Sequence, residues 1–318
     1  MKVKKFNYVK FGIFIFVVVL ILTSITIGIV ALVKHIKYTK TYEYRLLQVG
    51  YSKDDVSTIN NKLNDQEKEF LINKKYDSDS LEFLKEKYFI FENFDKYIAY
   101  KIEKKEIDNS RIVAIINTEV NVDWFEFEKK TDTSKGSLML VNRLYGLDSD
   151  FEVEDLVSIP SKYAYSGKKI SNSIMDDLIA MCDAASEDGY TLVVSNAYRS
   201  YKEQKKLYNE YADSYGKSYA DEFVARPGHS EYETGLSLDL EPYGKSYKNP
   251  KSSDEYIWLE ENAYKYGFIF RYTSEKEDLT LFPEDVWRLR YVGEDAATII
   301  YNEGICFEEY YAYFVKER

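Results

Sequence analysis

Residue types that commonly bind metal ions are scarce in this sequence. Its 318 residues include only two histidines and two cysteines, which nearly excludes metal chemistry built on several imidazoles or thiolates and excludes a disulfide-dense scaffold. Other side chains are better placed to take part in a functional site. Residues 236–240 alternate between leucine and polar residues, so Ser237 and Asp239 share one face of a half-buried strand. Arg199 carries a guanidinium, which suits recognition of a carboxylate or carbonyl.

Four motifs in the second half of the chain carry a family resemblance. They are Ser195-Asn196-Ala197-Tyr198-Arg199-Ser200 with Gln204, Arg226-Pro227-Gly228-His229-Ser230-Glu231-Tyr232-Glu233-Thr234-Gly235-Leu236-Ser237-Leu238-Asp239, Tyr266-Gly267-Phe268, and Arg290-Tyr291-Val292-Gly293. In order and spacing they resemble the zinc D-alanyl-D-alanine carboxypeptidases of the vancomycin-resistance type. The resemblance covers about Met139 to Tyr311. A weaker similarity over Leu46 to Leu147 matches the helical segment and linker that often precede that domain.

The resemblance implies a zinc peptidase site, and this chain departs from it. The family holds zinc with His, Asp and His, and a Glu acts as the general base. In this sequence Asp239 matches the Asp ligand, whereas Tyr232 stands at the first His position. Counting back from Arg290 without a gap puts Asp285 at the Glu position and Arg288 at the second His position. Two of the three zinc ligands are therefore replaced.

The replacements predict a site without zinc. A guanidinium has no lone pair to offer a metal and would repel it. A tyrosine ligates only as phenolate, which its ordinary pKa near 10 makes costly. Asp285 is one methylene shorter than Glu, and a displacement on that scale can reduce catalysis by about a hundredfold. We hypothesise that the Arg288 guanidinium fills the zinc position and pairs with Asp239, because a buried carboxylate without a counter-charge is costly.

Three functional interpretations follow from the resemblance. The first is an inactive relative outside the cell that binds a peptidoglycan stem peptide or a cell-wall protein, with Arg199, Ser230, Tyr232, Asp239 and Arg288 as its binding residues and Asp285 as a remnant of the base. The second is a working carboxypeptidase with an unorthodox metal site, built from Asp239, Asp285, Glu284 or His229. Oxygen ligands favour Ca²⁺ or Mg²⁺, which generate hydroxide less readily than zinc, so the sequence favours the first interpretation. The third is a structural membrane protein with an idle cleft.

Several other residues have simpler interpretations. We expect His229 on a surface loop and His35 near lipid headgroups. Cys182 lies beside an apolar helix face, which favours a buried free thiol over a bridge to Cys306. For Arg199 a structural salt bridge is as good an interpretation as substrate binding. The 31 tyrosines we interpret as compositional bias, with no carbohydrate-binding platform.

The N-terminal region predicts a membrane anchor. Residues 11–33 contain no charged side chain, and at 1.5 Å per residue they reach about 35 Å, enough to cross a bilayer. A cleaved signal or a buried helix are the alternatives. We expect a cytoplasmic basic tail over 1–10, the anchor over 11–33, a juxtamembrane helical segment and linker over 34–137, and the carboxypeptidase-like domain over 138–318.

Charge distribution argues against a nucleic-acid partner. Residues 1–40 hold seven lysines and no acidic residue, which leaves 36 basic and 54 acidic residues, a net charge of −18, in the remainder. Such a body repels a phosphate backbone.

The periodicity of the sequence predicts an α+β fold with helices packed on a mostly antiparallel sheet. Helices are expected over 171–186, 201–215, 254–266 and 294–303, strands over 191–194, 236–240, 268–272 and 287–292, and short helices between 46 and 106. Ile112–Ile116 is apolar and β-branched, which suits a buried strand, although periodicity alone does not separate it from a helix.

Overall fold

The computed structural model describes residues 7–74, 78–123 and 126–316, and the chain forms two compact units, residues 1–98 and 99–318. The first six positions of the predicted cytoplasmic tail lie outside the described residues. The division between the units falls within helix α6 (Phe94–Glu103). Residues 99–137, which the sequence grouped with the helical segment, belong to the same compact unit as the sheet.

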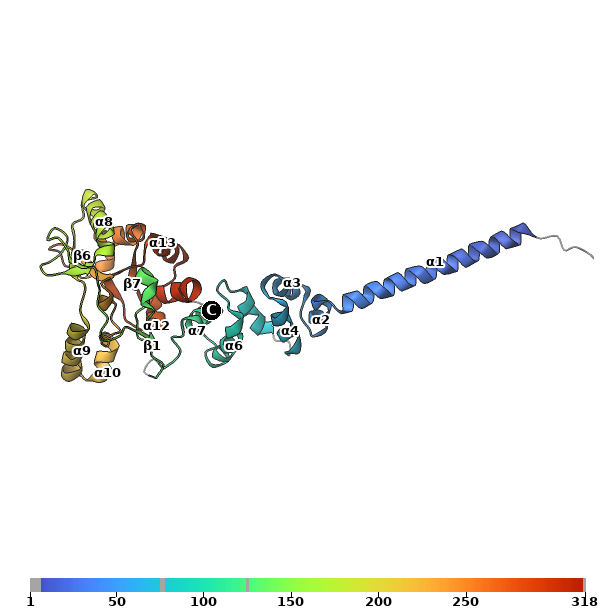
Figure 1. Cartoon of the computed structure of the whole chain (residues 1–318), viewed down its shortest axis with the longest axis horizontal. Helices are drawn as coiled ribbons and strands as arrows, with labels where there is room; N and C mark the ends of the chain where they lie inside the picture. Colours follow the sequence, from blue (N-terminus) through green and yellow to red (C-terminus); the bar gives the residue numbers. More distant parts are fainter. Residues whose placement is uncertain (1–6, 75–77, 124–125, 317–318) are drawn as a thin grey trace, which may run out of the picture. The chain divides into compact units, whose positions relative to one another are not determined.

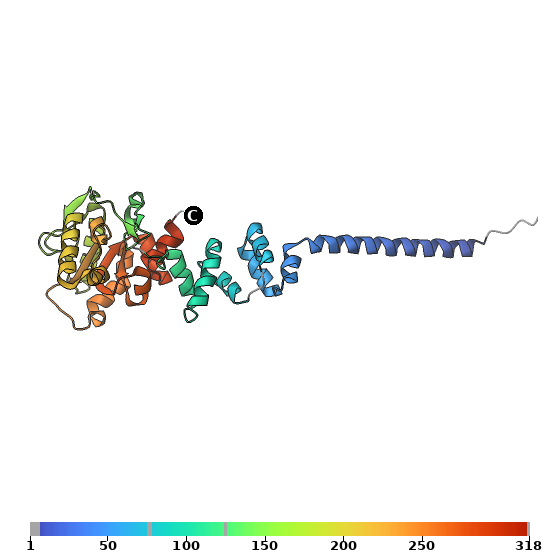
Figure 2. The ribbon, with the colours of Figure 1, turned by 90° about the horizontal axis from the view of Figure 1, so that it is seen from below.

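The first unit begins with a long apolar helix, α1 (Tyr8–Thr39), drawn as one uninterrupted helix in Figure 2. None of its residues is buried, and a stretch of 18 residues within it has a mean hydropathy of 3.0. Asn7 caps its first turn by accepting from the Lys10 amide at 3.1 Å. Among the described residues it is the one helix that is long and apolar enough to cross a membrane.

Short helices complete the first unit, as the sequence predicted. They are α2 (Tyr42–Gln48), α3 (Lys53–Lys62), α4 (Asp65–Asn73), α5 (Ser78–Glu82), two 3₁₀ turns (Phe83–Lys85 and Phe91–Asn93) and the first half of α6. A capping box begins α3, because Ser52 and Asp55 each accept from the other's amide. The core side chains are exposed by 2% or less and comprise Leu46, Ile59, Leu71, Phe83, Leu84 and Tyr97.

The second unit mixes helices and strands (Figure 1). Its helices are α7 (Asn109–Thr118), α8 (Met175–Glu187), α9 (Tyr201–Tyr215), α10 (Lys217–Phe223), α11 (Asp254–Asn262), α12 (Glu277–Thr280), α13 (Glu294–Glu303) and α14 (Phe307–Tyr310), followed by a π-helical turn, Tyr311–Val315. Its 3₁₀ turns are Thr133–Leu138, Asn172–Ile174, Glu231–Thr234, Pro250–Ser252, Ala263–Tyr266 and Ser274–Lys276. Its strands are β1 (Lys129–Lys130), β2 (Tyr145–Gly146), β3 (Leu156–Ser158), β4 (Lys169–Ser171), β5 (Leu192–Asn196), β6 (Ser237–Pro242), β7 (Phe268–Tyr272) and β8 (Asp285–Tyr291).

The central sheet has the strand order β5-β6-β8-β7, and all three pairings are antiparallel. Two small two-stranded sheets flank it: β1 with β2 in parallel, and β3 with β4 antiparallel. The predicted α+β class with a mostly antiparallel sheet is therefore confirmed. The four central strands and the helices α8, α9, α11 and α13 lie within a few residues of their predicted bounds.

The two faces of the sheet have different neighbours because side chains alternate along each strand. On one face Leu238 and Leu289 join a large apolar core with Leu178 of α8 and Leu259 of α11. On the other face a second core forms around Ile269 with residues of α13 and α14. Asp239 lies between Leu238 and Leu240 in the strand and therefore points to the face opposite α8.

One predicted strand is a helix. Ile112–Ile116 lies inside α7, which Asp108 caps by accepting from the Arg111 amide at 2.8 Å. All residues of α7 from Ile112 to Thr118 are buried. Because α7 is buried on every side, its sequence here is continuously apolar. It therefore lacks the 3.6-residue period of apolar residues that marks a helix with one exposed face.

Candidate functional site

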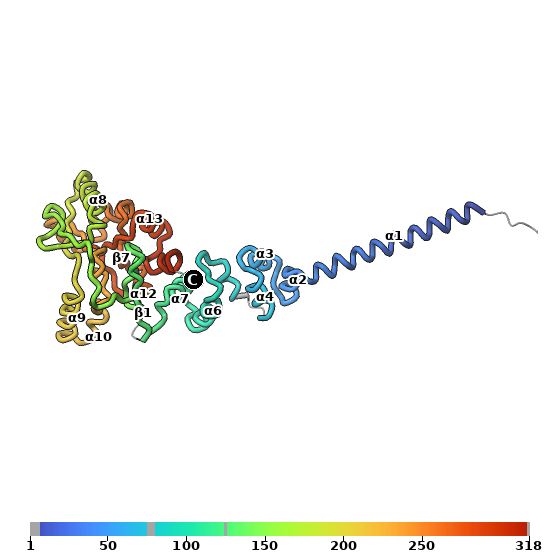
Figure 3. The backbone as a smooth tube through the Cα atoms, viewed as in Figure 1, coloured from blue at the N-terminus to red at the C-terminus, as the bar shows by residue number. Residues whose placement is uncertain are grey.

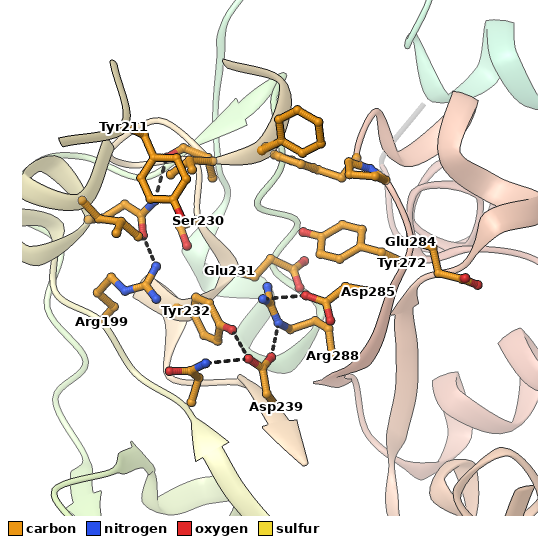
Figure 4. Close-up of a pocket in the computed structure, with 18 residues that line it drawn as sticks. Arg199, Tyr211, Ser230, Glu231, Tyr232, Asp239, Tyr272, Glu284, Asp285 and Arg288 are labelled. Carbon is orange, nitrogen blue, oxygen red and sulfur yellow. Dashed lines mark hydrogen bonds and ion pairs between the residues drawn. The ribbon is translucent and has the colours of Figure 1, made fainter. Parts of the chain in front are cut away.

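The site is built on a row of side chains that crosses three strands. Asn196 of β5 is the register partner of Asp239 of β6, and Asp239 is in turn the register partner of Arg288 of β8. Directly opposed residues on neighbouring strands bring their side chains within contact distance. Asn196 Nδ2 donates to Asp239 Oδ2 at 2.9 Å, and Arg288 Nε donates to Asp239 Oδ1 at 2.5 Å. The ion pair that the sequence predicted between Arg288 and Asp239 is present (Figure 4).

A register irregularity brings Asp285 to the same cluster. Residues three apart on a regular strand point to opposite faces. Between β7 and β8 the register shifts, so that Phe270 pairs with Leu289 and Tyr272 already pairs with Asp285. The extra residues on β8 let Asp285 turn towards Arg288, whose Nη2 donates to Asp285 Oδ2 at 2.9 Å.

Tyr232 lies over this cluster, held by the 3₁₀ turn η5 (Glu231–Thr234). Its hydroxyl donates to Asp239 Oδ2 at 2.7 Å, and the Arg288 guanidinium lies 4.0 Å from the centre of its ring. Gly235 ends the turn with φ of +70°, and a Cβ there would meet the Ser171 amide at 3.1 Å. The left-handed conformation and the close backbone both require glycine at this position.

The electrostatics keep Tyr232 neutral and Arg288 charged. Burial raises the pKa of Tyr232, so its hydroxyl keeps its proton and donates to Asp239. Burial acts to lower the pKa of Arg288, but Tyr232, Asp239 and Asp285 together raise it above its usual value. The pKa of Asp285 is raised by burial, with the positive charge of Arg288 opposing the shift.

Arg199 lies on the other side of Tyr232. Its guanidinium is 4.6 Å from the centre of the Tyr232 ring, and its Nη1 donates to Gln204 Oε1 at 2.8 Å. Among the described residues it forms no ion pair, so the structural salt bridge considered from the sequence is wrong. Arg199 is therefore a cation in the wall of a pocket, and no carboxylate of the described residues pairs with it.

These residues line one pocket of about 290 Å³, called the cleft below (Figure 4). Its lining comprises Asn196, Arg199, Gln204, Leu207, Tyr211, Phe223, Val224, Ala225, Ser230, Glu231, Tyr232, Asp239, Tyr272, Phe282, Pro283, Glu284, Asp285 and Arg288. All six site residues predicted from the sequence are among them. The motifs did not single out Tyr211 and Phe223, although their place in a run of aromatic residues four apart was a signal.

The alternative metal ligands are not brought together. Glu284 points away from Asp285 in Figure 4 and accepts from Lys251 Nζ at 2.8 Å. His229 was expected on the surface, and this expectation is wrong: it is 9% exposed and lies under Gly146, away from the cleft lining. Its ring contacts the Asn142 carbonyl at 2.8 Å because the loop after Gly228 folds inward onto β2.

The two cysteines do not pair. Cys182 and Cys306 are both buried free thiols, as the position of Cys182 beside an apolar helix face predicted. Burial raises the pKa of Cys182 to about 12, so neither reactivity nor metal binding is favoured there.

Comparison with known proteins identifies the family of this chain. The family model for VanY, D-alanyl-D-alanine carboxypeptidase, matches residues 167–294. YodJ of Bacillus subtilis is 35% identical over 210 residues, which cover 61% of this chain and 77% of YodJ. A D-alanyl-D-alanine carboxypeptidase of Enterococcus faecalis is 33% identical over 192 residues, covering 58% of this chain and 68% of the relative. The chain therefore belongs to the VanY-type D-alanyl-D-alanine carboxypeptidase family.

A solved structure extends the likeness to the fold. The LdcB LD-carboxypeptidase, whose structure is described as revealing the molecular basis of peptidoglycan recognition, has a TM-score of 0.55 with this chain. It is 36% identical, and the match covers 58% of this chain and 90% of LdcB.

Zinc is the metal that the family resemblance implies, and the side chains at the matching positions do not fit it. Zinc needs imidazole, thiolate or carboxylate donors. Arg288 offers no lone pair, and the lone pairs of Asp239 already accept hydrogen bonds from Asn196, Tyr232 and Arg288. Among residues 7–74, 78–123 and 126–316, no group of three or more His, Cys, Asp or Glu side chains is arranged to hold a metal ion.

Proposed function

We propose that this protein is a membrane-anchored, extracytoplasmic relative of the D-alanyl-D-alanine carboxypeptidases that binds a peptidoglycan stem peptide or a cell-wall protein without hydrolysing it through zinc. In this proposal residues 1–10 are cytoplasmic, 11–33 cross the membrane, 34–137 form the juxtamembrane segment, and 138–318 form the binding domain. The anchor rests on the length and hydropathy of α1, and the wall location rests on the family.

The observation that carries the proposal is the pairing of one guanidinium with both carboxylates of the cluster. Arg288 contacts Asp239 at 2.5 Å and Asp285 at 2.9 Å, and only 15% of its side chain is exposed. A permanent cation here satisfies the carboxylates that would otherwise bind a metal or accept a proton from water. Hydrolysis then lacks both a Lewis acid and a free base.

Binding is supported by the groups that this pairing leaves available. Arg199 lines the cleft and forms no ion pair within the described part of the chain, and Ser230 lines the same cleft. An arginine in this state can form a charge-assisted pair with the carboxylate end of a peptide. The binding residues proposed here are therefore Arg199, Ser230 and Tyr232, with Asp239 and Arg288 shaping the floor.

The test uses the full-length chain in detergent micelles. Three quantities are measured on one preparation: zinc content, release of D-alanine from a pentapeptide ending in D-Ala-D-Ala, and affinity for that pentapeptide by calorimetry. We expect substoichiometric zinc and no D-alanine release above the buffer control, together with saturable peptide binding. Chelator-sensitive D-alanine release by the unmodified protein would contradict the loss of hydrolysis.

A restoring variant sharpens the test. Tyr232→His with Asp285→Glu and Arg288→His returns the three replaced positions to the family pattern. We expect this triple variant to bind zinc stoichiometrically, because it regains two imidazoles around Asp239. The single variant Arg288→His is the matched control and should bind zinc weakly. Absence of both peptide binding and hydrolysis in the unmodified protein would favour an idle cleft or a protein partner.

A further inference from the structure

A row of four aromatic rings runs along helices α9 and α10. Tyr211, Tyr215, Tyr219 and Phe223 follow one another with centroid separations of 5.8, 5.1 and 4.6 Å. The first two belong to α9 and the last two to α10, and the two helices pack side by side (Figure 3). Successive rings are tilted by 55°, 41° and 40°, so the row forms a stepped surface.

Three of the four rings of the row are exposed and lie outside the apolar core between the two helices. Tyr215 is 65% exposed, Tyr219 44% and Phe223 46%. Tyr208, Ala220 and Val224 form the small apolar core between the two helices, and Tyr211 packs against it. The rings of Tyr215 and Tyr219 also meet across the two helices. Exposed aromatic side chains gathered in one patch mark a binding surface.

The row leads into the cleft. Tyr211 and Phe223, the two ends of the row, both line the pocket that contains Arg199 and Ser230. Figure 4 shows Tyr211 on the same side of the pocket as Arg199 and Ser230. A molecule held by the cleft can therefore continue directly onto the rings of Tyr215 and Tyr219.

The charge around the row indicates an uncharged occupant. Residues 201–224 carry four lysines and five acidic residues, so the two helices present no basic stripe for an anionic lipid or polymer. Each tyrosine of the row combines a flat apolar ring with a hydroxyl at its tip. Flat rings with adjacent hydrogen-bonding groups suit sugar rings, whose faces are apolar and whose edges carry hydroxyls.

We infer that the aromatic row binds the sugar rings of a glycan strand, with Tyr215 and Tyr219 as its central contacts. This inference rests on the proposed function, because a stem peptide in the cleft is covalently attached to a glycan that must pass close by. In this arrangement the cleft binds the peptide and the aromatic row binds the sugar rings. At these positions the inference departs from the interpretation of the tyrosines as compositional bias with no carbohydrate-binding platform.

The experiment compares two probes on the full-length protein in detergent. One probe is a soluble oligomer of β-linked N-acetylglucosamine, which carries no peptide, and the other is the free pentapeptide. In the variant Tyr215→Ala/Tyr219→Ala we expect affinity for the oligomer to fall about tenfold or more, because two stacking surfaces are lost. Affinity for the pentapeptide should stay unchanged, since neither residue lines the cleft.

Two control variants separate stacking from general effects. Tyr215→Phe/Tyr219→Phe keeps the rings and should keep most of the affinity for the oligomer. Tyr243→Ala removes a tyrosine that is 60% exposed and paired with Tyr165 outside the row, and it should change neither affinity. Circular dichroism confirms that each variant is folded.

The outcomes distinguish this inference from the proposed function. No oligomer binding by the unmodified protein, or equal binding by the double alanine variant, would overturn the glycan inference whatever the peptide result. Binding to phosphatidylglycerol vesicles that the double alanine variant loses, without oligomer binding, would assign the row to lipid and also overturn it. Oligomer binding that depends on the row, without pentapeptide binding, would support the row while contradicting the proposed peptide site.

Discussion

Arg288 and Arg290 are two residues apart on β8 and point to the same face of the sheet, yet their surroundings differ. Arg288 lies in the cleft floor, where 15% of its side chain is exposed, as is 14% of Asp239 and 38% of Asp285. Arg290 is fully buried and donates to the carbonyls of Ser137 and Met139 at 3.0 and 2.9 Å.

The cluster around Arg290 is a closed network of charges, called the buried cluster below. Arg271 of β7 donates through Nε to Glu231 at 2.8 Å and through both Nη atoms to Glu308 of α14, at 2.5 and 2.9 Å. Arg290 Nη1 lies 3.1 Å from Glu231. All four side chains are exposed by 2% or less, so each charge depends on its partners for stability.

The comparison shows that arginine–carboxylate pairs serve two purposes on one sheet. The buried cluster ties the turn η5, strand β7 and helix α14 together. Glu231 is adjacent to Tyr232, so the buried cluster also holds the turn that carries Tyr232 over the cleft. The cleft cluster instead faces solvent and leaves Arg199 beside it without a carboxylate partner among the described residues.

The largest expected effect comes from breaking the buried cluster. Arg271→Met leaves Glu231 and Glu308 buried without their main cation, and we expect a loss of about 3–5 kcal/mol in unfolding free energy. Denaturant unfolding of the full-length protein in detergent measures it. Arg271→Lys is the control and should lose less, because it keeps the charge without the bidentate geometry. If Arg271→Met lost less unfolding free energy than the variant Arg288→Met, the result would contradict the comparison.

Glu233 lies in the same turn and gives a pH-dependent effect. Burial raises the pKa of Glu233 to about 7, although it accepts from the Gly228 amide at 2.9 Å. A raised carboxyl pKa means that the folded state holds its proton longer than the unfolded state, so stability falls as pH rises from about 4.5 to 7.

Glu233→Gln removes this ionisation and keeps an amide oxygen for Gly228. We expect the unfolding free energy of the variant to exceed that of the unmodified protein by roughly 2 kcal/mol at pH 8 and by almost nothing at pH 4. Thermal unfolding across this range checks the difference between the two proteins. A gain that is the same at every pH would show that Glu233 does not titrate in this window.

Breaking the cleft cluster should have a smaller effect than breaking the buried one. Arg288→Met leaves Asp239 and Asp285 without their cation, but both carboxylates remain in contact with water. We therefore expect a loss of roughly 1–2 kcal/mol in unfolding free energy. Asp285 already has a raised pKa, and it protonates more readily once Arg288 is gone. The loss should therefore be smaller at pH 4 than at pH 8 in denaturant unfolding.

The smallest effect on stability is expected at Arg199. Arg199→Gln removes a cation–π contact with Tyr232 and no described ion pair, which predicts a loss of about 1 kcal/mol or less. Pentapeptide affinity should fall about tenfold or more, since the charge-assisted pair with the peptide is lost. Calorimetry and unfolding on the same sample test both parts. A large loss of stability with unchanged affinity would identify Arg199 as a structural residue.

The sequence by itself identified the family, the strand that carries Asp239 and the unusual pair of Tyr232 and Arg288. These features are local, because motif spacing, the alternation of residues 236–240 and the chemistry of a guanidinium need no tertiary contact. The prediction of a strand at Ile112–Ile116 was wrong because it depended on tertiary contacts. Burial on every side of α7 removed the periodic pattern that would have indicated a helix.

Tertiary structure decided which charges meet and which surfaces remain exposed. The register shift opposite Tyr272 turns Asp285 to Arg288, and the packing of β7 against α14 joins Arg271 to Glu308 across 37 residues. Tertiary packing also turns His229 inward and aligns aromatic rings from α9 and α10 beside the cleft. Such contacts depend on strand register and on helix packing between distant segments, which residue spacing along the chain does not encode.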